Sequence, residues 1–179
     1  IPIGFSPVPW NTLRAVLETK GIDLSTVTLL EGLSASEAIT CFKNGGAVYI
    51  HLPHPYSQIL IEDGIGYLVA PLGPELGYVC YSSLAASPGF IDGNHKVVQA
   101  VVDGFQKALK WIDGSCASCI AGKISVFFPD ILETTLEKAI SQYKIQKTWP
   151  RDALIREDGY DAMRDILIDG GLIKGRYPY

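Results

Sequence analysis

The first 75 residues alternate short apolar runs with helical repeats, and this alternation limits the fold more than any other feature of the chain. The apolar runs, which read as strands, fall at residues 1–5, 27–30, 47–52 and 66–70. The helical patterns between them fall at residues 9–20, 34–43 and 56–62. Strands that are separated by helices pair in parallel, because each helix carries the chain back across the sheet. The sequence therefore predicts a small α/β lobe.

Local signals support the helix boundaries. Proline is tolerated in the first turn of a helix, as at Pro9, and Gly21 is placed to end that helix. Leu13, Val16 and Leu17 form its apolar stripe. The next helix opens with Ser34 and Glu37, the spacing of a capping box, and stops at the Asn-Gly-Gly of residues 44–46.

The second half of the chain is predicted to be helical after one more strand at residues 78–84. The longest helix begins at Asp92 or Asn94 and runs to about Ile112. Its apolar residues recur every three or four positions and give one wide face: Val98, Val101, Val102, Phe105, Leu109 and Ile112. Further helices are predicted at residues 116–127, 131–144 and 158–170. We therefore divide the chain into an α/β lobe at 1–77 and a helical region at 78–179.

Composition excludes some classes of function. The net charge is −4 with no basic run, which argues against a nucleic-acid partner. No run of 18 apolar residues is present, so the sequence predicts no membrane-spanning helix. The chain begins at Ile1 without a charged and then apolar leader, which fits either a cleaved leader or a piece of a longer protein.

Cys116 and Cys119 form a C-x-x-C motif. Such a pair can serve a redox centre or half of a zinc site. Zinc needs a second Cys/His pair, and His51, His54 and His95 do not have that spacing. The redox interpretation expects the motif to open a helix after a strand, whereas here it follows a long helix. We interpret both cysteines as small, mildly apolar residues on one short helix, and we expect no metal or other cofactor.

Catalysis has little support in the sequence. G-x-S-x-G, H-E-x-x-H and a phosphate-binding glycine loop are all missing from it. We expect a protein that is not an enzyme.

Several motifs together resemble the extracytoplasmic solute-binding proteins of ABC importers, of the nitrate, sulfonate and thiamine-precursor type. Residues 3–7 and 11–20 are similar to the opening of the second lobe in that family. Residues 42–47 and 53–56 are similar to its helix end and its later Pro-containing turn, where His54 replaces an acidic residue. The tail adds the Phe-Phe-Pro-Asp of 127–130, Trp149-Pro150 and the Gly-Leu-Ile of 171–173.

The resemblance implies a fold like the type II periplasmic binding proteins, with one βαβ lobe and the C-terminal helices of the other lobe. The N-terminal part of that other lobe would then be missing from this chain. It implies capture of a small organic or oxyanion solute between two lobes by hinge closure, outside the cytoplasm, with ABC transporter membrane subunits as partners. A second copy of the chain is a further candidate partner.

Ligands of open α/β folds sit at the carboxyl ends of strands, near helix N-termini. Two stretches meet that condition. The first offers Ser6, Trp10 and Asn11, and the second offers His51, His54 and Tyr56. We predict these six as ligand-binding residues. Each also has a structural alternative, because Trp10 can pack against a helix and His51 can be a core histidine.

Two other functions stay open at this point. One is an enzyme of the thiamine-pyrimidine biosynthesis type, which would need a cysteine- and histidine-rich iron site. The other is a fragment that binds no solute and associates with itself through an exposed apolar face.

Overall fold

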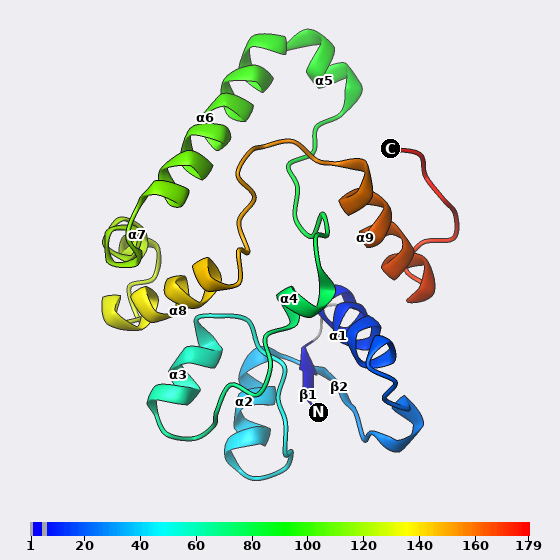
Figure 1. Cartoon of the computed structure of the whole chain (residues 1–179), viewed down its shortest axis with the longest axis vertical. Helices are drawn as coiled ribbons and strands as arrows, with labels where there is room; N and C mark the ends of the chain where they lie inside the picture. The colour runs from blue at the N-terminus through cyan, green and yellow to red at the C-terminus, as the bar shows by residue number, and fades with distance from the viewer. Residues whose placement is uncertain (1, 5–6) are drawn as a thin grey trace. The chain divides into compact units, whose positions relative to one another are not determined.

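A computed structural model describes residues 2–4 and 7–179 and divides the chain into two compact units (Figure 1). The first unit joins Ile1–Val79 to Glu157–Tyr179, and the second is Cys80–Arg156. Helices dominate both units. Within the described residues the predicted α/β character is limited to one two-stranded sheet. The assignment of residues 78–179 to a lobe that begins before this chain stays a prediction.

The sheet of the first unit is a βαβ element. β1 (Pro2–Gly4) pairs in parallel with β2 (Leu30–Leu33), and α1 (Pro7–Thr19) connects them. Gly21 ends α1 in the left-handed region at φ 72°, where its N–H donates to the Glu18 carbonyl over 2.9 Å. The parallel pairing expected from the alternation is therefore present at the N-terminus.

β2 begins later than the predicted residues 27–30. The Asp23 carboxylate accepts a hydrogen bond from the Ser25 N–H at 2.9 Å and opens the 3-10 helix η1 (Leu24–Thr26). Because this turn occupies the chain up to Thr26, extended pairing starts only at Leu30.

Three further predicted strands, at residues 47–52, 66–70 and 78–84, are wrong for the structure as described. These segments are irregular, and their apolar side chains point largely into solvent: Val48 is 82% exposed, Tyr67 is 91% exposed and Leu84 is 67% exposed. An extended segment becomes a strand only when a neighbour accepts its backbone hydrogen bonds. The described part of the chain offers these segments no such neighbour.

Four more helices belong to the first unit: α2 (Ala35–Lys43), α3 (Tyr56–Glu62), α4 (Leu72–Leu76) and α9 (Glu157–Asp169). The capping box of α2 is confirmed. The Ser34 N–H donates to the Glu37 carboxylate at 2.8 Å, and the Glu37 N–H donates to the Ser34 hydroxyl at 3.3 Å. α4 was not predicted, and an ion pair between Lys20 and Glu75 links it to the end of α1.

α9 packs against α1, so the last helix of the chain lies beside its first helix (Figure 1). Leu13 and Val16 of α1 are buried, as is Met163 of α9. Arg164 is also buried, and its guanidinium pairs with Asp161 at 2.6 Å and donates to the Tyr177 carbonyl at 3.2 Å. The hydrogen bond to Tyr177 holds the last residues against α9.

In the described residues the regular elements of the second unit are all helices. It contains α5 (Pro88–Gly93), α6 (His95–Gly114), α7 (Ala117–Ile124), the 3-10 helix η2 (Ser125–Phe127) and α8 (Glu133–Ile145). Its core is the contact between α7 and α8, where Ile120, Ala121, Leu136 and Ile140 are at most 4% exposed. The three predicted helices 92–112, 116–127 and 131–144 are confirmed to within a few residues.

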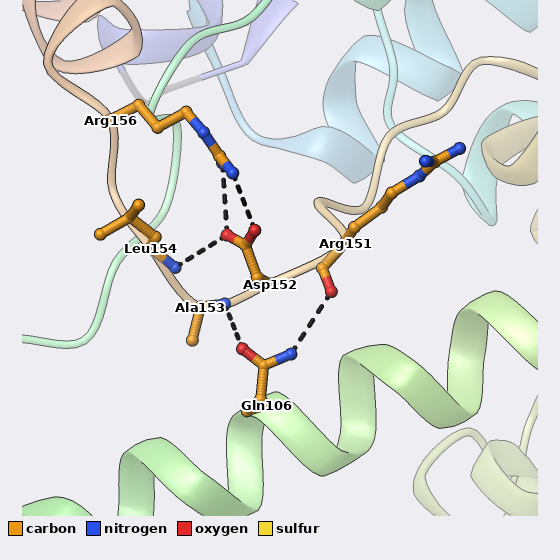
Figure 2. A network of polar contacts seen from close by, with 6 residues as sticks. All are labelled: Gln106, Arg151, Asp152, Ala153, Leu154 and Arg156. Carbon is orange, nitrogen blue, oxygen red and sulfur yellow. Dashed lines mark hydrogen bonds and ion pairs between the residues drawn. The ribbon is translucent and has the colours of Figure 1, made fainter.

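The apolar face of α6 is more exposed than its spacing suggests. Leu109 is buried at 3% exposure, whereas Val101 is 51% exposed and Phe105 is 46% exposed. Gln106 on the same helix holds the segment before α9: its side chain donates to the Arg151 carbonyl at 3.4 Å and accepts from the Ala153 N–H at 2.9 Å (Figure 2). The Asp152 carboxylate pairs with the Arg156 guanidinium at 2.7 Å and accepts from the Leu154 N–H at 3.1 Å, and these two contacts lower the pKa of Asp152.

Lys144 of α8 caps the C-terminal end of α6. Its ammonium donates to the carbonyls of Ile112, at 2.7 Å, and Ser115, at 2.8 Å, with a longer bond to Asp113 at 3.3 Å. The last carbonyls of a helix have no partner within the helix and carry partial negative charge. A cation there therefore supplies the missing hydrogen bonds and also interacts favourably with the helix dipole.

Replacing this ammonium should weaken the second unit. We expect Lys144→Met to lower the free energy of unfolding by about 1–3 kcal/mol, because hydrogen bonds from a charged donor are lost and the α6 carbonyls stay uncapped. Urea unfolding followed by circular dichroism measures this. Lys110→Met removes the same charge from an exposed site on α6 and should change stability by less than about 0.5 kcal/mol. Equal effects of the two variants would refute the capping role.

Candidate functional site

The first group of predicted ligand-binding residues lies at the N-terminus of α1, a position that normally presents four free N–H donors. Two of the first four residues are Pro7 and Pro9, which leaves the amides of Val8 and Trp10. Trp10 is half-buried. Ser6 lies outside the described residues. This helix end therefore offers an anion about half of the usual number of backbone N–H donors.

Asn11 is buried at 4% exposure. Its side-chain amide donates to the Pro7 carbonyl at 2.8 Å, within its own helix. Gly170, directly after α9, lies against it so closely that a Cβ atom there would overlap the Asn11 side chain. Asn11 therefore has a clear packing role between α1 and the end of α9, and its role in binding a ligand stays a prediction.

The second group lies ahead of α3. His51 is half-buried in the irregular segment that precedes this helix, and burial lowers its pKa below the ordinary value of 6.5. The pKa of His54 is lowered for the same reason. At neutral pH both imidazoles are therefore uncharged, and each has one N–H donor and one acceptor nitrogen.

His54 is held by a residue that the sequence analysis missed. The Ser57 hydroxyl, in the first turn of α3, lies 3.0 Å from Nδ1 of His54. The three-residue spacing at the start of a predicted helix was the available signal. Tyr56 opens α3 and is 45% exposed, after a cis peptide bond between His54 and Pro55. The segment thus presents an imidazole and an exposed phenol close together in the sequence.

These two groups lie on different elements of the first unit. α1 packs against α4, α9 and β1, whereas residues 51–56 lead into α3. The structure joins His54 to Ser57 and Asn11 to the end of α9. That all six predicted residues form one binding site stays a prediction.

Two other kinds of site were searched for in the described part of the chain. No group of three or more His, Cys, Asp or Glu side chains there is arranged to hold a metal ion. None of the helices described combines the length and apolar composition that crossing a bilayer requires.

The packing of Asn11 can be tested at Gly170. We expect Gly170→Ala to destabilise the protein by about 1–3 kcal/mol, because the new methyl group displaces a buried amide. Thermal unfolding followed by tryptophan fluorescence measures the change. Gly175→Ala is the matched control, since a Cβ atom there meets nothing within 4 Å. Unchanged stability in both variants would show that the packing of Asn11 against Gly170 does not contribute to stability.

The burial of His51 predicts a pH dependence of stability. Its folded pKa lies below 6.5, so the unfolded chain binds more protons as the pH falls below 6.5. The stability that depends on uncharged His51 is therefore fully present above pH 6.5, and it is lost as the pH falls toward the folded pKa. We expect the wild type to lose more stability than His51→Phe between about pH 7.5 and about pH 5.5 in urea unfolding. The control His95→Phe replaces an exposed histidine and should lose as much stability as the wild type over this pH range. Equal slopes of stability against pH in all three proteins would contradict the burial of His51.

Comparison with known proteins gives one family and one curated relative. The model of the NMT1-like family matches residues 7–123. The Bacillus subtilis (strain 168) protein named "Putative binding protein YtlA" is 25% identical over 153 residues, which cover 86% of this chain and 46% of that protein. The chain thus spans about half the length of this relative. No solved structure matches the chain.

The matched residues include the β1–β2 crossover helix, the segment with His51 and His54, and helices α6 and most of α7. They stop before the tail on which much of the predicted resemblance rested. The family match still covers more than half of the chain and confirms the resemblance to solute-binding proteins for part of a protein. This chain belongs to the NMT1-like family.

Proposed function

We propose that this chain is part of the solute-binding component of an ABC importer, which holds a small organic or oxyanion solute between two lobes that close about a hinge. The observation that carries the proposal is the family match over residues 7–123. The name of the Bacillus relative, a binding protein, supports binding rather than catalysis as the broad role. The location that follows is outside the cytoplasm, with transporter membrane subunits as partners.

The exposed apolar segments support the proposal that this chain is one part of a two-lobed protein. Residues 47–52, 66–70 and 78–84 are predicted as strands from the sequence, yet Val48, Tyr67 and Leu84 are mostly exposed. Apolar surface of this extent normally has a partner. In the proposed whole protein, chain beyond these 179 residues pairs with some of these segments and gives a fold like the type II periplasmic binding proteins.

The chemistry of residues 51–56 bears on the solute. Uncharged His51 and His54 can donate and accept hydrogen bonds but do not offer a full positive charge at neutral pH. Tyr56 adds an exposed aromatic ring and a hydroxyl. This combination favours an uncharged or aromatic solute, such as a pyrimidine, over an inorganic oxyanion. An oxyanion would bind more tightly as the pH falls and the imidazoles gain charge.

Isothermal titration calorimetry on the full-length protein tests the proposal. A panel of alkyl sulfonates, nitrate and aminopyrimidines should contain one solute that binds in a 1:1 ratio. We expect His51→Phe to weaken that binding at least tenfold, about 1.4 kcal/mol, because a polar contact to the solute is lost. His95→Phe, an exposed site on α6, should leave the affinity unchanged.

The 179-residue chain alone should bind the same solute at least about 100-fold more weakly, because the second lobe is needed to bury it. Silence of the full-length protein across the whole panel would contradict the proposal. Light scattering on the 179-residue chain tests the rival interpretation, a fragment that associates with itself. A dimer that binds no solute would favour self-association through the exposed apolar segments.

A further inference from the structure

The two cysteines of the C-x-x-C motif do not pack in a core. Cys116 is the N-cap of α7, Cys119 lies one turn further on, and both are exposed. They are joined by a disulfide bond. The sequence analysis placed both residues on one short helix, as the structure does, but it did not predict the disulfide bond between them. The motif does open a helix, although the helix follows α6 and not a strand.

This disulfide is poorly placed to act as a structural staple. A disulfide stabilises a fold chiefly by restricting the unfolded chain, and the effect grows with the length of the loop that it closes. Here the sequence separation is only three residues, and the first turn of α7 already holds both residues close together. The α7–α8 core contact is made by Ile120 and Ala121, on the buried side of the helix. Global stability therefore does not account for the bond.

The surroundings favour a reactive thiolate at Cys116. The Cys119 N–H donates to Cys116 Sγ at 3.2 Å, and the N-terminus of α7 places its other free amides nearby. The Lys144 ammonium from α8 binds the carbonyl of Ser115, the preceding residue, at 2.8 Å. Two carboxylates oppose these groups: Asp113 precedes the motif, and Glu133 lies at Gly122, near the other end of α7.

We propose that Cys116 and Cys119 form a thiol–disulfide exchange site for small thiols and their disulfides. In the dithiol form, the Cys116 thiolate attacks one sulfur of an external disulfide RS–SR, breaks its S–S bond and releases RS⁻. Cys119 gives its proton to solvent, attacks Cys116 Sγ of the mixed disulfide and expels the second RS⁻. The pair loses two electrons, and the external disulfide becomes two thiols. The reverse sequence opens the bond with two equivalents of thiol. This activity does not depend on solute binding.

The experiment uses the full chain with Cys41→Ala and Cys80→Ala, so that only the motif reacts, and oxidised glutathione as the probe. In this background, Cys119→Ser leaves the proposed nucleophile and Cys116→Ser leaves only its partner. We expect Cys119→Ser to form a mixed disulfide with one glutathione at least about tenfold faster than Cys116→Ser does, by mass spectrometry of acid-quenched samples. The protein with both cysteines should instead close its own disulfide and retain no glutathione.

Guanidinium supplies the matched control, because unfolding removes the helix but keeps the sequence. The rate ratio of the two single-cysteine proteins should then fall close to one, and circular dichroism in buffer verifies that both are folded. Equal rates in the folded proteins would overturn the proposal. Two retained glutathiones in the protein with both cysteines would do the same, since they would show that Cys119 does not resolve the mixed disulfide.

Discussion

The structure depends first on the rule that an extended segment needs a neighbour for its backbone hydrogen bonds. β1 and β2 meet this condition through α1, which returns the chain so that the two strands lie parallel (Figure 1). Residues 47–52, 66–70 and 78–84 have strand-like sequences but no strand pairing in the described structure, and their apolar side chains stay in solvent. In the proposed whole protein, the same rule requires a neighbour for any of these segments that forms a strand.

The two units are stabilised by different means. In the first, α1 and α9 bury Leu13, Val16 and Met163, and the close approach of Gly170 to Asn11 joins the end of the chain to its first helix. In the second, the apolar contact between α7 and α8 is supported by Lys144 at the last carbonyls of α6. The proposed solute-binding residues lie in the first unit and the proposed exchange site in the second. A change in one chemistry should therefore leave the other in place.

Burial decides the chemistry of both proposed sites. His51 and His54 lose positive charge at neutral pH because their surroundings disfavour the imidazolium form, so they are suited to polar contacts with an uncharged solute. Cys116 and Cys119 are exposed, so small thiols can reach them, and the N-terminus of α7 favours the thiolate. The sequence analysis named the histidines as candidates but gave the cysteines no chemical role, because residue spacing alone does not give exposure.

The sequence by itself determined the longer helices and several of their ends. The Ser34–Glu37 capping box, the left-handed Gly21 and the apolar spacing of α6 are local, and local hydrogen bonds and sterics are enough to specify them. The family was also within reach of the sequence. Only the tertiary structure decided which apolar runs pair as strands and that Asn11 is covered by Gly170. These features bring together segments that are far apart in the sequence, and their contact depends on packing. An apolar run also looks the same in the sequence whether or not a neighbouring strand pairs with it.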